Sequence, residues 1–120
     1  MPKFIRSLRF ACSGIVLAVR SQRHMKIHSV AAGIVVIIGA MLPLSRLDWA
    51  VLLLAIALVI TLEMVNTAVE STVDLASPGI HPLAKAAKDV AAGAVLVATC
   101  FAVIIGLLIL GPPLWHFIRD

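Results

Sequence analysis

Three long apolar runs, separated by short polar breaks, fill most of the chain after the first 28 residues. They cover about 29–44, 49–73 and 90–110. A helix rises about 1.5 Å per residue, and the hydrocarbon core of a bilayer is about 30 Å thick. Each run therefore predicts a transmembrane helix, although the first is only just long enough to span.

Each break contains residues that end helices. Pro43 and the polar turn at 45–48 follow the first run, and Ser77-Pro78-Gly79 follows the second. Pro82 is expected to prolong this second loop, so that the third helix begins after a polar patch. Gly111-Pro112-Pro113 predicts the end of the third helix and a short tail, because proline cannot donate a helical hydrogen bond.

The N-terminal segment 3–20 has a different pattern. Arg6, Arg9 and Arg20 fall near one helical face, and the remaining positions are mostly apolar. Such a stripe is typical of a helix that lies on the membrane surface. The alternative is a fourth spanning helix, which the arginines disfavour. The predicted fold class is an all-α integral membrane protein, a single domain with an N-terminal amphipathic surface helix plus three transmembrane helices.

The composition supports a membrane protein. Hydrophobic residues make up 62% of the 120 positions and charged residues 13%, which is more apolar surface than a small soluble domain can bury. The net charge is +4, and basic residues crowd the N-terminal part, where we expect them to face anionic membrane lipids. No basic patch with interleaved aromatic residues is present, so a nucleic-acid partner is excluded.

The basic residues also orient the predicted helices. The N-terminus and the 77–89 loop carry most of them, which predicts that both are cytoplasmic. The 45–48 turn has one basic and one acidic residue and is expected outside. Three spans then place the C-terminus outside as well.

Four polar residues form a stripe within the second apolar run. Glu63, Asn66, Glu70 and Asp74 stand at i, i+3, i+7 and i+11, on one face of a helix. An ionisable group this deep costs about 2.5–3.5 kcal/mol on insertion scales, and spanning a bilayer does not require it. The stripe therefore indicates a function. A structural hydrogen-bond seam between helices and a proton or ion pathway are the alternatives.

Lys88-Asp89 opens the third run, level with the cytoplasmic end of this stripe. Lys88 would either neutralise the acidic residues or bind phosphate oxygens while the carboxylates hold a divalent metal. The second arrangement has the parts that phosphoryl transfer needs, a cation, a metal and a carboxylate that takes the hydroxyl proton. The chain has no P-loop and no kinase-type glycine-rich loop.

Other polar residues are less informative. His24 and His28 are i, i+4 and form a candidate metal pair, but with no third ligand nearby they are better interpreted as interfacial residues. His81 would contact a nucleotide or be solvated. The small residues of Ala91-Ala92-Gly93-Ala94 allow close helix packing, within a subunit or between subunits.

Two segments resemble the signature of the prokaryotic diacylglycerol kinase family. They are E-M-V-N-T-A-V-E at 63–70, followed by Asp74, and A-K-D-V-A-A-G-A at 87–94. The residues that follow Asp74 look most like the undecaprenol kinase branch. The resemblance implies ATP- and magnesium-dependent phosphorylation of a lipid alcohol at the cytoplasmic side of the bacterial inner membrane. It also implies a homotrimer with shared active sites.

The resemblance assigns roles to individual residues. Glu63 would be the catalytic base at the lipid hydroxyl, with Asn66 as a second catalytic residue beside it. Glu70 would bind the magnesium ion that accompanies ATP. The other residues expected to bind the nucleotide are Asp74, Gly79, Ile80, His81, Lys88 and Asp89.

One position departs from the family pattern. Many members have a glutamate that binds metal after the amphipathic helix, and Gln22 stands there in this chain. An amide oxygen can coordinate magnesium but brings no charge. We expect Gln22 to be the second metal ligand. The predicted function is phosphorylation of undecaprenol, with diacylglycerol as the alternative acceptor and an inactive membrane interaction protein as the alternative of another class.

Overall fold

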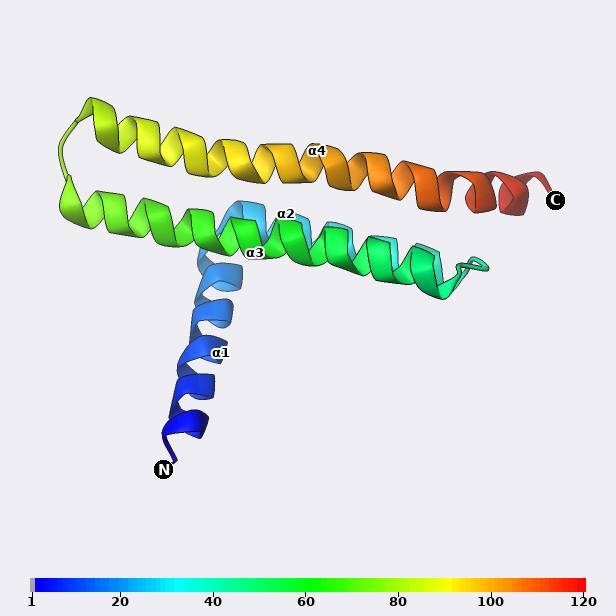
Figure 1. The fold of residues 1–120 in the computed structure, drawn as a ribbon, viewed down its shortest axis with the longest axis horizontal. Helices are drawn as coiled ribbons and strands as arrows, with labels where there is room; N and C mark the ends of the chain where they lie inside the picture. Colours follow the sequence, from blue (N-terminus) through cyan, green and yellow to red (C-terminus); the bar gives the residue numbers. More distant parts are fainter. Residues whose placement is uncertain (1) are drawn as a thin grey trace.

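The computed structural model describes residues 2–120 as four helices. They are α1 (Lys3–Ser21), α2 (Arg23–Ala40), α3 (Arg46–Ala76) and α4 (Pro82–Arg119). Helices α2, α3 and α4 run side by side, and α1 leaves them crosswise (Figure 1). The α2–α3 turn lies at one end of this bundle and the α3–α4 loop at the other (Figure 1).

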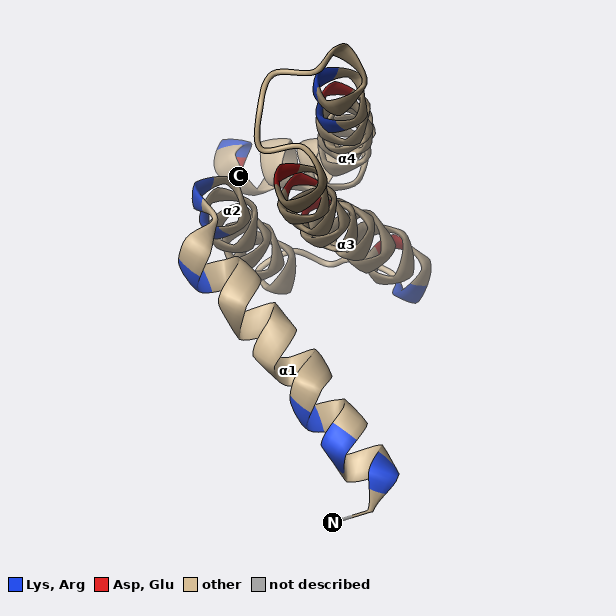
Figure 2. Ribbon diagram, turned by 90° about the vertical axis from the view of Figure 1, so that its left-hand side faces the viewer, with Lys and Arg blue, Asp and Glu red and all other residues tan. Residues whose placement is uncertain are grey.

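Helix α1 matches the predicted N-terminal helix almost residue for residue. Nearly all of its side chains are exposed, and Ala18 is its one buried residue. Its lysine and arginine residues lie toward its two ends, with an uncharged stretch between them (Figure 2). Because α1 is directed away from the axis of the other helices, it would lie in the membrane plane if those helices cross the bilayer. Its position on a membrane surface stays a prediction.

Two of the described helices are long and apolar enough to cross a membrane. They are α3, with a mean hydropathy of 2.2 over its most apolar window, and α4, with 2.8. Helix α2 is also mostly apolar, but it begins with the basic turn at Arg23, earlier than the predicted start at residue 29. Two spans are thus supported by length and composition, and the third stays a prediction.

Helix α3 begins with a capping box. Ser45 Oγ accepts a hydrogen bond from the backbone N–H of Asp48, and Asp48 Oδ2 accepts one from the backbone N–H of Ser45, both at 3.0 Å. These two bonds satisfy N–H groups that a helix start otherwise leaves unpaired. The predicted polar turn therefore starts the helix at Arg46, three residues before the predicted start at Trp49.

The predicted loop before α4 was too long. Pro82 is the first residue of the helix, and His81 Nδ1 accepts a hydrogen bond from the backbone N–H of Leu83 at 3.1 Å. Proline suits a first helical position because the N–H that it lacks has no intrahelical partner there. The polar patch at 85–89 consequently belongs to the helix.

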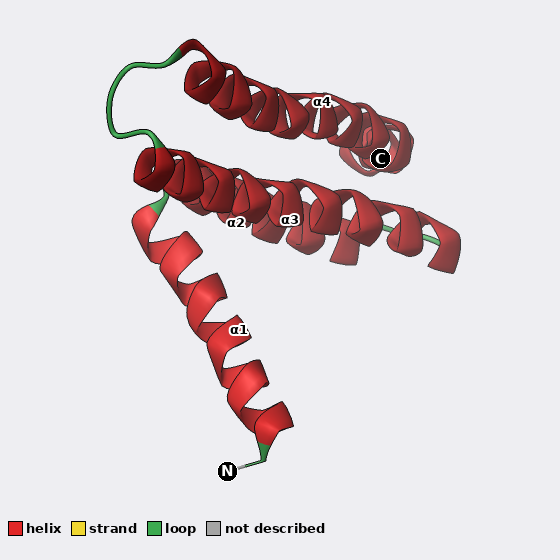
Figure 3. Cartoon of the chain, turned by 60° about the vertical axis from the view of Figure 1, so that its left-hand side comes forward, coloured by secondary structure: helices red, strands yellow, loops and turns green. Residues whose placement is uncertain are grey.

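The predicted end of α4 at Gly111 was wrong. The helix continues through Pro112 and Pro113 to Arg119, although these prolines cannot donate to the carbonyls one turn earlier. The φ angle of proline is itself helical, so the chain loses two hydrogen bonds without having to leave the helix. Unwinding an apolar segment would leave more backbone groups unpaired. Figure 3 shows this segment as continuous helix.

A cluster of buried hydrophobic residues lies near the α2–α3 turn. Leu42, Leu52 and Leu110 are buried there and are surrounded by partly buried hydrophobic residues, including Trp49. Helix α2 approaches closely at Gly39, where an added Cβ would lie 2.9 Å from Cη2 of Trp49. This end of the bundle has an apolar core, although two of its leucines, Leu52 and Leu110, also line a groove between the helices.

Candidate active site

Glu63 and Asn66 are the buried polar residues of α3. Glu63 is 3% exposed and Asn66 is 7% exposed, although burying a carboxylate or an amide is costly unless it is paired. The predicted stripe places both on the helix face that packs inside the bundle. Both are buried, whereas Asp74, farther along the same stripe, is exposed.

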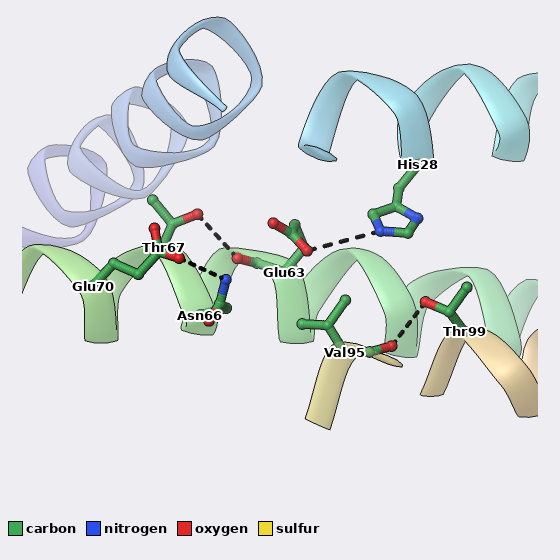
Figure 4. Close-up of polar contacts among 7 residues, drawn as sticks. All are labelled: His28, Glu63, Asn66, Thr67, Glu70, Val95 and Thr99. Carbon is green, nitrogen blue, oxygen red and sulfur yellow. Dashed lines mark hydrogen bonds and ion pairs between the residues drawn. The ribbon is translucent and has the colours of Figure 1, made fainter. Parts of the chain in front are cut away.

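Glu63 faces a histidine from another helix. The side chain of His28 on α2 is directed at Glu63, with 3.8 Å between Nε2 and Oε2 (Figure 4). This distance exceeds that of an ordinary hydrogen bond. Residues 2–120 contain no group of three His, Cys, Asp or Glu side chains able to hold a metal ion, so no third ligand of these types joins His24 and His28.

Asn66 connects the buried part of the stripe to Glu70. Its Nδ2 donates to Glu70 Oε1 at 3.3 Å, whereas its Oδ1 is buried and has no hydrogen-bond partner among the described residues. Thr67 Oγ1 donates to the carbonyl of Glu63 at 3.0 Å (Figure 4). The free Asn66 oxygen is an acceptor that a bound hydroxyl or amine would satisfy, since an unpaired buried acceptor is costly.

A cavity of about 350 Å³ lies at the α3–α4 loop. Five residues predicted to bind the nucleotide line it, namely Asp74, Gly79, Ile80, His81 and Lys88. Asp89 and Glu70 do not line it. Ser77, Pro78, Ala84 and Lys85 complete the lining and were missed by the sequence analysis. The sequence could have indicated that Lys85 lines this cavity, because Lys85 stands three residues before Lys88 and so shares its helical face.

Two ion pairs organise the charges at this cavity. Lys88 Nζ bonds to Asp74 Oδ1 and so joins α4 to α3. Lys85 Nζ donates to Asp89 Oδ2 at 2.5 Å within α4. The pKa of Lys85 is raised, first by this hydrogen bond and then by the attraction of the Asp89 charge. Asp89 therefore acts on the cavity through Lys85.

Gln22 is the single residue between α1 and α2. It has an extended backbone (φ −109°, ψ 119°), and its N–H donates to the carbonyl of Ala18 at 3.1 Å. Helix α1 contacts both α2 and α3, and α3 carries Glu70. The basic residues that follow Gln22 form the first turn of α2.

The chemistry of Glu70 and Gln22 suits magnesium. Both have side-chain oxygen atoms, which are the donors that magnesium prefers. Glu70 accepts its one hydrogen bond within residues 2–120 through Oε1, which leaves Oε2 available. Magnesium beside a nucleotide is usually held by one or two protein carboxylates together with phosphate oxygens and water, so a cluster of three protein ligands is not required.

Comparison with known proteins decides the family. The family model for prokaryotic diacylglycerol kinase matches residues 9–110, which include all the residues of the candidate site. The chain belongs to the prokaryotic diacylglycerol kinase family. The two segments that carry the resemblance lie on α3 and α4, the pair of helices with the most extensive contact.

Relatives of this diacylglycerol kinase family member have two kinds of name. This chain is 46% identical over 112 residues to the undecaprenol kinase of Bacillus subtilis (strain 168), and the match covers 93% of this chain and 91% of that protein. It is 45% identical over 114 residues to a diacylglycerol kinase of Synechocystis, covering 94% of this chain and 65% of that protein. The diacylglycerol kinase of Escherichia coli (strain K12) is 28% identical, covering 85% of this chain and 84% of its own length.

Proposed function

We propose that this protein is a lipid kinase that transfers the γ-phosphoryl group of ATP to the hydroxyl group of undecaprenol. The observation that carries this proposal is one helix, α3, with a buried carboxylate at Glu63 and a cation-lined cavity at its end. Membership of the family and 46% identity to a protein named undecaprenol kinase support it.

The buried carboxylate is suited to proton acceptance. In the proposed step, the lipid hydroxyl oxygen attacks the γ-phosphorus and forms a new P–O bond. The bond between that phosphorus and the β,γ-bridging oxygen breaks, ADP leaves, and the hydroxyl proton passes to Glu63. Because Glu63 is only 3% exposed, water has little access to compete with the lipid alcohol.

The cavity at the α3–α4 loop is suited to the nucleotide. Lys88 would donate to phosphate oxygens, and its bond to Asp74 holds it at the junction of the two helices. The backbone of Gly79 and Ile80 and the side chain of His81 form the loop side of the cavity. Glu70 and Gln22 would hold magnesium, which when bound neutralises negative charge on the phosphates.

We also propose that α2, α3 and α4 all cross the bacterial inner membrane and that three chains assemble into a homotrimer. Many large apolar side chains of α3 and α4 are exposed in the single chain, such as Leu54, Leu96 and Leu107. Lipid or a neighbouring subunit would cover them. The active site would face the cytoplasm, on the side of the basic α1–α2 junction.

An assay with purified protein tests the proposal. ATP labelled on the γ-phosphate is supplied with magnesium and either undecaprenol or diacylglycerol in detergent micelles. We expect transfer of label to both lipids or to undecaprenol alone, with a higher kcat/KM for undecaprenol. Transfer to diacylglycerol alone would favour the second candidate, which the 45% identity to the Synechocystis diacylglycerol kinase supports. Absence of label in every lipid contradicts kinase activity.

A further inference from the structure

The separation between His28 and Glu63 allows both side chains to bind one oxygen atom that lies beside the line joining them. Nε2 and Oε2 are 3.8 Å apart, and the two side chains are 19% and 4% exposed. This is too long for a direct hydrogen bond, but an oxygen could lie about 2.8 Å from each atom at once. A hydroxyl group there would accept from Nε2–H and donate to the carboxylate, so both of its hydrogen-bonding functions would be used.

His28 also stands at the end of an apolar groove of about 380 Å³ between α2, α3 and α4. Small residues from all three helices open the groove, among them Ala31, Ala55 and Gly106. Val59 and Ile60 line it as well and are one turn from Glu63 on the same helix. A chain lying in this groove would therefore end near the gap between His28 and Glu63.

The groove offers very few hydrogen-bond donors. Among the described side chains that line it, only His28 and Thr99 carry one. Thr99 Oγ1 already donates to the carbonyl of Val95 at 2.8 Å (Figure 4). An ester carbonyl placed in this groove would lose its bonds to water without replacement, which is costly. The groove consequently suits an alcohol whose chain is hydrocarbon alone.

We propose that His28 is a second residue that contacts the acceptor hydroxyl, and that the hydrocarbon chain of a polyprenol lies in the groove between α2, α3 and α4. His28 Nε2–H donates to the hydroxyl oxygen, and Glu63 accepts the hydroxyl hydrogen. His28 thus holds the nucleophile beside its base. This inference rests on the proposed kinase activity, and it adds a reason for preferring polyprenols over diacylglycerols.

Three variants of the full-length protein test the role of His28. His28→Leu removes the donor and keeps a side chain of similar size. His28→Gln restores an N–H donor, and His24→Leu is the matched control, because His24 is an exposed histidine one turn earlier on α2. Initial rates are measured with ATP, magnesium and undecaprenol in micelles, and the melting temperature of each variant is recorded.

We expect His28→Leu to lower kcat/KM for undecaprenol about tenfold, the effect of one hydrogen bond of ordinary strength. His28→Gln should stay within about threefold of wild type, and His24→Leu should not differ from it. The KM for ATP should be unchanged in all three. An unchanged kcat/KM in His28→Leu, a parallel rise in the KM for ATP, or a His28→Gln variant as impaired as His28→Leu would each overturn the assignment.

Gly106→Leu tests the groove. A Cβ at Gly106 meets nothing within 4 Å, so the larger side chain enters the groove without displacing backbone. We expect a loss of activity with undecaprenol that is at least tenfold greater than the loss with the single-isoprene alcohol 3-methylbut-2-en-1-ol, which is too short to reach Gly106. Equal losses with both alcohols, together with a smaller oligomer in detergent, would show that a second copy of the chain fills the groove, and would overturn this placement of the lipid chain.

The outcome for wild type separates this inference from the proposed function. Wild-type transfer of phosphate to undecaprenol, with unchanged kinetics in His28→Leu, overturns the inference alone. Wild-type transfer to none of the lipid alcohols overturns the kinase proposal and this inference with it.

Discussion

One end of the helix bundle is apolar and the other is charged. Near the α2–α3 turn, Leu42, Leu52 and Leu110 are buried together, and the ring of Trp49 packs closely against Gly39. At the α3–α4 loop, charged side chains surround an open cavity of about 350 Å³. Figure 2 looks toward the loop end and shows charged residues of α3 and α4 on both sides of the loop.

This difference indicates that stability and chemistry are separated along the same helices. Apolar packing at one end fixes α2 against α3, so that the other end can expose a loop and ion pairs without unfolding. Glu63 and Asn66 lie between these regions, buried but polar. Substitutions at the loop end and at Glu63 should therefore change catalysis with little change in stability, and those that disturb the contact between Gly39 and Trp49 should do the reverse.

The largest effect is expected for Glu63→Gln. The amide keeps the shape of the side chain but cannot take the hydroxyl proton, so turnover should fall by about 10²-fold or more. ATP affinity should persist, because the cavity that we assign to the nucleotide is lined by other residues. Initial rates and nucleotide titration check this. Near-normal turnover would refute the assignment of Glu63 as the base.

A somewhat smaller effect is expected for the proposed magnesium ligands, Glu70 and Gln22. Glu70→Gln removes the charged ligand and should raise the half-saturating magnesium concentration by roughly tenfold or more. Gln22→Glu adds a carboxylate that the metal attracts, and should lower that concentration severalfold. Titration of magnesium at fixed ATP measures both. An unchanged half-saturating magnesium concentration in Gln22→Glu, together with a large rise in Glu70→Gln, would mean that a residue other than Gln22 completes the metal site.

The two lysines of the cavity provide the next comparison. Lys88→Gln should raise the KM for ATP about tenfold, because a charge-assisted hydrogen bond to phosphate is lost. Lys85→Gln should raise it less than threefold, because the Lys85–Asp89 pair lies within α4 and does not join the two helices that form the cavity, as the Lys88–Asp74 pair does. Both pairs are exposed, so neither change should lower the melting temperature measurably. An equal rise in the KM for ATP in Lys88→Gln and Lys85→Gln would show that the pair between α3 and α4 does not contribute more to nucleotide binding than the pair within α4.

The smallest effect on catalysis is expected at the packed end. Gly39→Ala places a Cβ 2.9 Å from the Trp49 ring and should destabilise the fold by about 1–2 kcal/mol. Gly33→Ala is the control on the same helix, where the added Cβ meets nothing within 4 Å, and it should be neutral or stabilising. Thermal melting in detergent gives both values. A large loss of activity per folded molecule in Gly39→Ala would contradict the separation between the two ends.

Much of this protein follows from local sequence pattern. The helical character of 3–20 and of 49–73 is confirmed within three residues at each end. The spacing of Glu63, Asn66 and Glu70 predicts a shared face, and the Asn66–Glu70 hydrogen bond joins two of them. These features are local, because the period of the helix determines which nearby side chains share a face.

The helix ends were harder to predict. Pro82 was expected in a loop and Gly111 at a helix end, but α4 includes both. A proline signals a break only where the chain gains from leaving the helix. At Pro82 the missing N–H costs nothing, and at Pro112 and Pro113 the continuous apolar helix tolerates two lost hydrogen bonds.

Only the tertiary structure decided which residues meet across helices. His28 and Glu63 are far apart in sequence, and nothing near His28 indicates that a carboxylate faces it. Asp89 pairs with Lys85, whereas Asp74 pairs with Lys88. Such partners depend on the relative translation and rotation of packed helices, which the interlocking of many side chains sets together. The sequence by itself determined which groups each helix presents, and the packing of α2, α3 and α4 decided which of them form a site.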